Sequence, residues 1–136
     1  MPKAAGINQK LKLLYMAKIF EEETDEEHML TIYDICDRLS KYEINSSRKV
    51  AAEDIALLTQ FGMDIITDRS KRSARYYLGQ RRFEIPELKL LADSVSSARF
   101  ITEKKSRSLL KKLEALAGRF RGQEINRRVY VANRVK

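Results

Sequence analysis

The chain has 136 residues, with 27 Lys and Arg against 19 Asp and Glu, for a formal net charge of +8. This length fits one domain or two small ones, and 43% hydrophobic residues supply enough material for a core, which argues against disorder. One cysteine and one histidine exclude an internal disulfide and a Cys/His zinc site. With no membrane-length apolar run and no secretory signal in the polar N-terminal stretch, we expect a cytoplasmic protein.

The charge is unevenly distributed along the chain. Residues 1–82 carry 14 basic and 13 acidic side chains, whereas residues 83–136 carry 13 basic and 6 acidic ones. The first half contains an acidic run at 21–27, which is typical of a solvated connection, and a basic run from Arg69 to Arg82 with no acid between. A basic block within a hairpin pattern favours a polyanionic partner, and solubility is the alternative explanation.

The first two predicted helices precede residue 42. Apolar residues at helical spacing predict a helix from about Asn8, a suitable N-cap, to Glu22. A second helix is predicted from Thr31 to about Lys41, with Thr31 as N-cap and Asp34 completing a capping box. Its apolar stripe includes Ile32, Ile35, Cys36 and Leu39. Cys36 on this stripe predicts a small buried apolar group, with a redox sensor as the alternative.

The third predicted helix runs from an N-cap at Ser47 to Phe61, and Gly62 suits the left-handed position after it. Its apolar face contains Ala51, Ile55 and Leu58. At about 100° per residue, the opposite face is mostly small and polar, so it can lie close to another surface. That face consists of Lys49, Ala52, Glu53, Ala56 and Gln60.

A β-hairpin is predicted after Gly62. β-Branched and aromatic residues at 64–67 and 74–78 predict two strands, and the polar stretch 68–73 predicts a basic turn between them. A boundary at 79–85 separates this hairpin from two further helices. They are predicted over about 86–99 and 102–117, and an alternating pattern at 128–135 predicts a final strand.

Three helices followed by a β-hairpin is the element order of a winged helix-turn-helix, in which the third helix reads DNA and the hairpin is the wing. The predicted fold is mainly α with a small β component: this winged helix-turn-helix, a helical hairpin and a C-terminal strand. The candidate recognition-helix contacts to DNA are Ser46, Ser47, Arg48, Lys49, Ala52 and Glu53. The candidate wing contacts are Arg69, Lys71, Arg72 and Arg75.

Each of these sites also has a simpler explanation. Ser47 can serve only as a helix cap and Arg48 as a solvated side chain, while the basic turn can serve only solubility. The two later helices are rich in leucine, and a two-helix hairpin seldom buries both its faces. We therefore expect this region to contribute to a homodimer. The candidate contacts are Leu88, Leu91, Val95, Leu109, Leu113 and Leu116.

Four segments resemble WYL-domain transcriptional regulators of the type common in Firmicutes. They are LKLLYMAKIFEEETDEEHMLTIYDICDR from Leu11, SRKVAAEDIALLTQFGMDII from Ser47, FEIPELKLLADSVSSARFITEKKSRSLLKKLEALAG from Phe83, and NRRVYVANRVK at the C-terminus. The resemblance implies a DNA-binding domain over 1–82 and a helical linker or dimerisation region over 83–136. It also implies a following effector domain, absent from this sequence, that would bind the effector ligand. Ala51 and Ala52 depart from the larger residues common in the family's recognition helices.

The sequence therefore predicts a sequence-specific transcriptional regulator that binds double-stranded DNA as a homodimer. A protein–protein adaptor with a basic solubilising surface is the alternative. RNA binding is a third possibility, which no aromatic platform or GXXG loop supports. We expect no enzymatic activity, cofactor or metal, because the sequence contains no phosphate-binding glycine loop, no activated nucleophile and no metal-ligand cluster.

Overall fold

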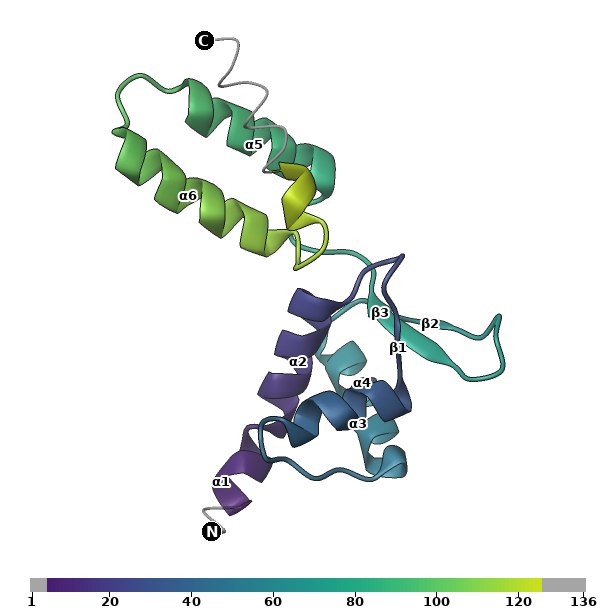
Figure 1. The fold of residues 1–136 in the computed structure, drawn as a ribbon. Coiled ribbons are helices and arrows are strands. Elements are labelled where there is room, and N and C mark those ends of the chain that lie inside the picture. Colours follow the sequence, from purple (N-terminus) through teal and green to yellow (C-terminus); the bar gives the residue numbers. More distant parts are fainter. Residues whose placement is uncertain (1–4, 126–136) are drawn as a thin grey trace. The chain divides into compact units, whose positions relative to one another are not determined.

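The computed structural model describes residues 5–125. Within this range the chain forms two compact units, of which unit 1 ends at Gly79 and unit 2 begins at Gln80. Unit 1 combines helices with a small antiparallel sheet, and unit 2 is helical (Figure 1). The prediction of a mainly α chain with a small β component is confirmed. Between residues 5 and 125, no helix is long and apolar enough to cross a membrane.

The first helical segment is divided in two. Helix α1 spans Ala5–Lys10 and helix α2 spans Lys12–Glu23, with Leu11 between them. Asn8 lies inside α1, so the prediction that it caps a single helix is wrong. The backbone at Leu11 stays close to helical geometry, and its carbonyl accepts a 2.9 Å hydrogen bond from the N–H of Tyr15. Propensity and periodicity do not reveal this break because the apolar pattern continues across it.

Helix α3 spans Ile32–Ser40 and begins with the predicted capping box. The N–H of Asp34 donates to the Thr31 hydroxyl at 3.1 Å, and the Asp34 carboxylate accepts from the N–H of Thr31 at 2.9 Å. Two N–H groups that the first turn leaves without helical partners are thereby bonded. The helix turns Ile35 and Leu39 into the core.

A turn without glycine joins α3 to the next helix. Glu43 adopts a left-handed backbone conformation with φ +62°, which costs a non-glycine residue about 1–2 kcal/mol. The surrounding turn holds it there: the N–H of Glu43 donates to the Ser40 carbonyl, and the next residue, Ile44, is fully buried. Burial of Ile44 thus stabilises a locally strained turn.

Helix α4 spans Arg48–Phe61, as predicted. The hydroxyl of Ser47 accepts from the N–H of Val50 at 3.1 Å, and Gly62 follows the helix with φ +126°, where a β-carbon would be strained. The helix buries Ala51, Ile55 and Leu58.

The sheet has three antiparallel strands in the order β1-β3-β2, where β1 is Leu30–Thr31, β2 is Ile65–Asp68 and β3 is Arg75–Leu78. The β2–β3 hairpin was predicted and projects beyond the helices of unit 1 (Figure 1). Strand β1 was not predicted. It pairs Leu30 with Tyr76 and Thr31 with Arg75, so that β1 connects α3 to the hairpin.

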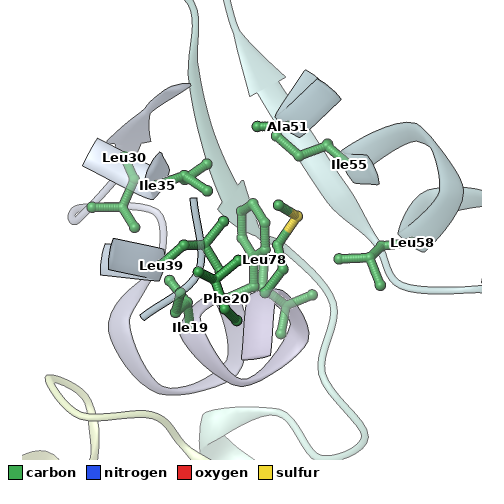
Figure 2. Packing of buried hydrophobic residues seen from close by; sticks show 11 residues of the cluster. Ile19, Phe20, Leu30, Ile35, Leu39, Ala51, Ile55, Leu58 and Leu78 are labelled. Atoms are coloured by element: carbon green, nitrogen blue, oxygen red, sulfur yellow. The ribbon is translucent and has the colours of Figure 1, made fainter. Parts of the chain in front are cut away.

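The core of unit 1 lies between α2, α3, α4 and the sheet, and Figure 2 shows how its side chains interdigitate. Helices α3 and α4 bury residues of the apolar faces predicted from their periodicity. Helix α2 buries Met16 and Phe20 as its pattern predicts, but it also buries Ile19, and it leaves Leu13, which the pattern places on the apolar face, 37% exposed. The buried residues are Met16, Ile19, Phe20, Leu30, Ile35, Leu39, Ile44, Ala51, Ile55, Leu58 and Leu78. This packing fixes α4 against the other helices and defines which of its faces is exposed.

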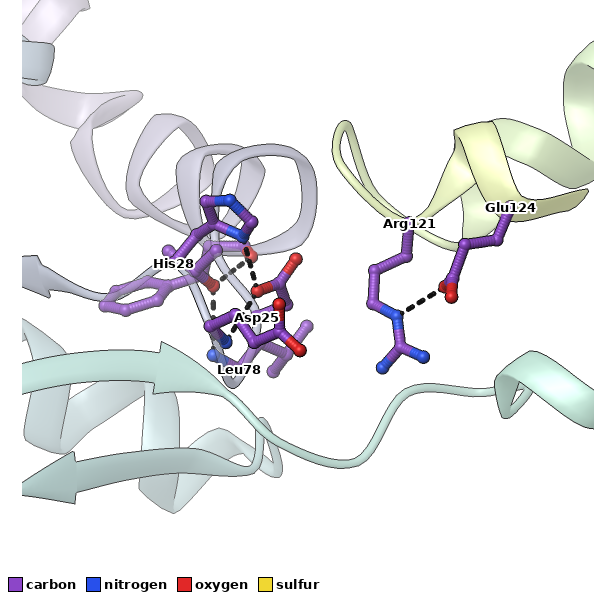
Figure 3. Close-up of polar contacts among 8 residues, drawn as sticks. Asp25, His28, Leu78, Arg121 and Glu124 are labelled. Carbon is purple, nitrogen blue, oxygen red and sulfur yellow. Dashed lines mark hydrogen bonds and ion pairs between the residues drawn. The ribbon is translucent and has the colours of Figure 1, made fainter. Parts of the chain in front are cut away.

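The acidic run at 21–27 is more ordered than the predicted solvated connection. Thr24 and Asp25 are buried. The Thr24 hydroxyl donates to the carbonyl of Phe20 at 2.7 Å and accepts from the N–H of Leu78 at 3.0 Å, which joins α2 to β3. Asp25 and His28 form a two-way backbone bridge, and their side chains also bond at 2.8 Å (Figure 3). The prediction of a solvated connection is wrong because the charge pattern does not reveal the two hydrogen bonds of the Thr24 hydroxyl.

Unit 2 is built on helices α5, Ile85–Ser97, and α6, Glu103–Leu116. Thr102 caps α6 as predicted, whereas α5 is capped by Glu84 and has Pro86 in its first turn. Side chains from α5, from α6 and from residues 117–125 pack together in a small core. Its buried residues are Leu88, Ala92, Ala117 and Ile125. The strand predicted at 128–135 lies outside the described residues.

Candidate nucleic-acid interface

The exposed side of α4 includes the whole face predicted from the sequence. The α4 outer face consists of Lys49, Ala52, Glu53, Ala56 and Gln60, all of which are exposed. Two alanines lie among three polar side chains, so a flat surface can approach the helix backbone closely. A helix of about 10–12 Å diameter also fits the roughly 12 Å width of a DNA major groove.

The start of α4 concentrates hydrogen-bond donors. Ser47 caps the helix, and the hydroxyl of the half-buried Ser46 donates to the Ser47 carbonyl at 3.1 Å. Arg48 follows as the first helical residue and is exposed. Backbone N–H groups at a helix N-terminus attract phosphate, and an adjacent guanidinium strengthens that attraction.

Arg48 contacts a residue that sequence reasoning did not single out. Its guanidinium donates a hydrogen bond to the hydroxyl of Tyr33 and lies over the Tyr33 ring, 5.0 Å from the ring centroid. Tyr33 itself is 57% exposed. Tyr33 lies in the first turn of α3, so the pair spans the N-terminal ends of α3 and α4. Fifteen residues separate the two positions, and no periodic pattern links them.

An ion pair anchors α4 to α2. The Lys12 ammonium lies 2.9 Å from Oδ2 of Asp54, and the two side chains are 9% and 14% exposed. Removing one partner of a largely buried pair leaves the other charge uncompensated, so this contact stabilises the packing of α4 against α2. Cys36 is half-buried nearby, and burial raises the pKa of its thiol, while the positive charges of Lys12 and Arg48 act in the opposite direction. The thiol is therefore protonated at neutral pH and packs against the core.

The tip of the β2–β3 hairpin carries exposed cations. We call residues 69–74 the hairpin tip; in it Arg69, Lys71 and Arg72 are all exposed. Asp68 orders the start of the tip, because its Oδ1 accepts a 2.8 Å hydrogen bond from the N–H of Ser70. Hydrogen bonds from the Ser70 hydroxyl and N–H, with the charges of Arg75 and Lys71, lower the pKa of the Asp68 carboxyl.

Arg75 differs from the other three candidate wing residues. It is half-buried as the first residue of β3, where it lies opposite Asp68 in the strand register. Its Nη2 lies 3.5 Å from Oδ2 of Asp68. The hairpin thus presents three exposed cations at its tip, and the fourth is partly neutralised within the sheet.

A second exposed surface follows one edge of α4. The α4 apolar shoulder consists of Val50, Leu57 and Phe61, which are 41%, 49% and 86% exposed. Counted from Arg48 at about 100° per residue, these residues lie at about 180–220° around the helix axis, whereas the outer face is centred near 100°. Large apolar groups in a row on one helix can mark a protein contact.

In unit 2 the six candidate dimer residues divide by exposure. Leu88 is fully buried in the core of the unit, and Val95, Leu109 and Leu113 are half-buried. Leu91 and Leu116 are 37% and 41% exposed, so they are the candidates available to a second subunit.

Among the described residues, no group of three or more His, Cys, Asp or Glu side chains could hold a metal ion. No protein-family model and no curated protein matches the chain.

Proposed function

We propose that this chain is the DNA-binding part of a transcriptional regulator that recognises a specific sequence in double-stranded DNA. In this proposal unit 1 is a winged helix-turn-helix, α4 is its recognition helix and the β2–β3 hairpin is its wing. The observation that carries the proposal is the pairing of a continuous, small and polar outer face on α4 with exposed cations at the hairpin tip.

The phosphate contacts come from two places. The N-terminus of α4, with Ser46, Ser47 and Arg48, attracts a phosphate through N–H groups, hydroxyls and a guanidinium. Tyr33 supports this contact by holding the Arg48 guanidinium against its ring and hydroxyl. At the hairpin tip, Arg69, Lys71 and Arg72 contact a neighbouring backbone or enter a narrow minor groove, whose negative potential attracts arginine.

The base contacts come from the α4 outer face. Lys49 can donate to guanine, Glu53 can accept from the amino group of cytosine, and Ala52 can contact the methyl group of thymine. Burial of Ala51, Ile55 and Leu58 in the core leaves this face exposed, and the Lys12–Asp54 ion pair joins α4 to α2. The proposal includes a homodimer, because two copies of a helix-turn-helix reading two half-sites reach useful affinity and fix the half-site spacing.

The resemblance to WYL-domain regulators agrees with this reading of the surfaces. It extends the proposal to a regulator whose activity is controlled by an effector ligand bound to a following WYL domain. The identity of the ligand would be set by that domain and not by the residues described here.

The test is selection of bound sequences from random duplex DNA, followed by binding measurements with the selected site. We expect an enriched motif whose preference at particular base pairs is relaxed in Lys49→Ala and Glu53→Ala, by about 1–3 kcal/mol at each affected pair. A matched control is available in α2, where Lys18 and Glu22 have the same chemistry and the same spacing and are both exposed. Lys18→Ala and Glu22→Ala should leave every preference intact.

Two results would contradict the proposal. Selection that yields no enriched motif would remove sequence-specific binding. A motif whose preferences survive both Lys49→Ala and Glu53→Ala would show that α4 is not the reading element.

The alternative function is a protein–protein adaptor, and the α4 apolar shoulder is the observation that favours it. In this case Phe61→Ser would abolish capture of a protein partner, and DNA binding would be weak and independent of sequence. Under the DNA-binding proposal, Phe61→Ser leaves the selected motif unchanged.

A further inference from the structure

Helix α6 carries a second concentration of positive charge, separate from α4 and from the hairpin tip. The α6 basic face consists of Lys104, Lys105, Arg107, Lys111 and Lys112, and all five side chains are exposed. At about 100° per residue they occupy roughly 160° of the helix circumference. Ser108 and Ala115 are the other residues in this sector, so no acidic side chain lies within it.

The opposite side of α6 is used for packing. Leu110 and Leu113 contact the core of unit 2 around Leu88 and Ala92, and α5 and α6 lie side by side (Figure 1). The basic face therefore points away from α5. It is a surface that the fold of unit 2 leaves uncovered.

The arrangement of these charges is unfavourable for the helix itself. Lys104 and Lys105 lie in the first turn, at the positive end of the helix dipole, where a cation is unfavourable. Arg107 has like charges three residues before it and four residues after it, at Lys104 and Lys111, which is also destabilising. One exposed ion pair, Arg107 to Glu103 at 2.6 Å, offsets part of this repulsion. Sequences depart from such local preferences mainly at functional surfaces. An anion bound to this face would replace the repulsion among these cations with attraction.

We propose that the α6 basic face binds the phosphate backbone of duplex DNA, at phosphates other than those contacted by α4 and the hairpin tip. The inference rests on the proposed function for the identity of the polyanion. Lys104 and Lys111 are seven residues apart, about 10.5 Å along the helix. A DNA strand presents a phosphate every 3.4 Å along the duplex axis. The row of lysines along α6 can therefore lie along a row of phosphates on one strand. The contact reads no sequence; it adds affinity and lengthens the protected site.

The experiment measures the dependence of duplex binding on salt for the full chain. The test variant is Lys104→Gln with Lys111→Gln and Lys112→Gln. The control removes the same charge from exposed positions of unit 1: Lys10→Gln with Lys18→Gln and Lys41→Gln. Each lost phosphate contact lowers the log–log salt slope by about 0.9, so we expect the α6 variant to lose about 2.7 from the slope and the control to lose almost nothing. The preferred sequence should be the same in both variants.

Other outcomes overturn the inference and separate it from the proposed function. Equal salt slopes for the α6 variant and the control would show that the α6 basic face is only solvated. If the selected sequence motif is still recognised in that case, the proposed function stands. A wild-type chain that binds no duplex in a salt-dependent way would overturn both. If polyglutamate competes as effectively as duplex DNA of equal charge, the partner of α6 is an acidic protein and the inference is wrong.

Discussion

Thr24 illustrates how a single side chain can join two parts of unit 1. It is 1% exposed, although it lies in a run of acidic residues. Its hydroxyl both donates to the end of α2 and accepts from β3. The N–H of Leu78 is buried at this point, so the hydroxyl of Thr24 provides the acceptor that a solvent molecule would supply at the surface.

We expect Thr24→Val to destabilise unit 1 by about 1–3 kcal/mol, because valine has the same shape and leaves the Leu78 N–H without this acceptor. Urea unfolding followed by tyrosine circular dichroism reports on unit 1, since five of the six tyrosines precede Gly79. Thr24→Ser, which keeps the hydroxyl, is the control and should lose less. Equal losses for the two variants would mean that packing of the methyl group, and not the hydrogen bond, is what matters.

Individual residues of the candidate interface were predictable where they follow from one helix. The exposed face of α4 could be derived from its period, and so could the cap at Ser47. The contact between Tyr33 and Arg48 could not, because it depends on how α3 crosses α4. The pairing of Arg75 with Asp68 follows from the hairpin register, which places the two residues opposite each other across the tip.

At the scale of elements, the β2–β3 hairpin depends on Asp68. The carboxylate orders the tip through Ser70 and balances Arg75 at the first pair of the ladder. The ion pair with Arg75 requires the ionised carboxylate, and ionisation strengthens the hydrogen bonds from Ser70, which agrees with the lowered pKa of this group. These contacts of Asp68 are therefore linked to pH in the acidic range.

We expect the contribution of Asp68 to be complete above the ordinary aspartate pKa of about 3.9, and to be lost as pH falls below it through the lowered pKa of the folded hairpin. Nuclear magnetic resonance of the Ser70 amide between pH 6 and 2 should show a transition with a midpoint below 3.9. The same transition should be absent in Asp68→Asn, which keeps an acceptor for the Ser70 N–H. A midpoint at or above 3.9 would contradict the assignment of these hydrogen bonds.

The elements that could be predicted are those whose signals are local. α3 and α4 have caps and clear apolar faces, and the hairpin has two strands close in sequence. Strand β1 has two residues, too few for any periodic signal, and its partners in β3 are more than 40 positions away. The break at Leu11 is invisible for the opposite reason, since the helical pattern continues through it.

At the scale of the whole molecule, the two units differ in what they leave exposed. Unit 1 exposes the α4 outer face and a basic hairpin tip, while unit 2 exposes a basic helix and apolar side chains that its small core does not cover. Leu91 and Leu116 belong to this uncovered set, and they are the surface members of the predicted dimer contact. A dimer through them would be apolar at its centre and charged at its rim.

We expect the chain to shift toward a dimer with rising concentration, and the double variant Leu91→Gln with Leu116→Gln to stay monomeric. Light scattering measures the mass directly. The matched control is Leu14→Gln with Leu90→Gln, which removes two leucines that are each 67% exposed. If both double variants dimerise like the wild type, the contact lies elsewhere; if the wild type is monomeric at every concentration, this chain does not form the dimer.

The strained turn at Glu43 is a position where a substitution can increase the stability of the protein. Asparagine tolerates the left-handed conformation better than glutamate, so Glu43→Asn should recover part of the 1–2 kcal/mol held in that turn. The position lies outside the α4 outer face, the hairpin tip and the α6 basic face. A chain carrying this change would tolerate destabilising substitutions on α4, and it is therefore a suitable background for the α4 variants that test the proposed function.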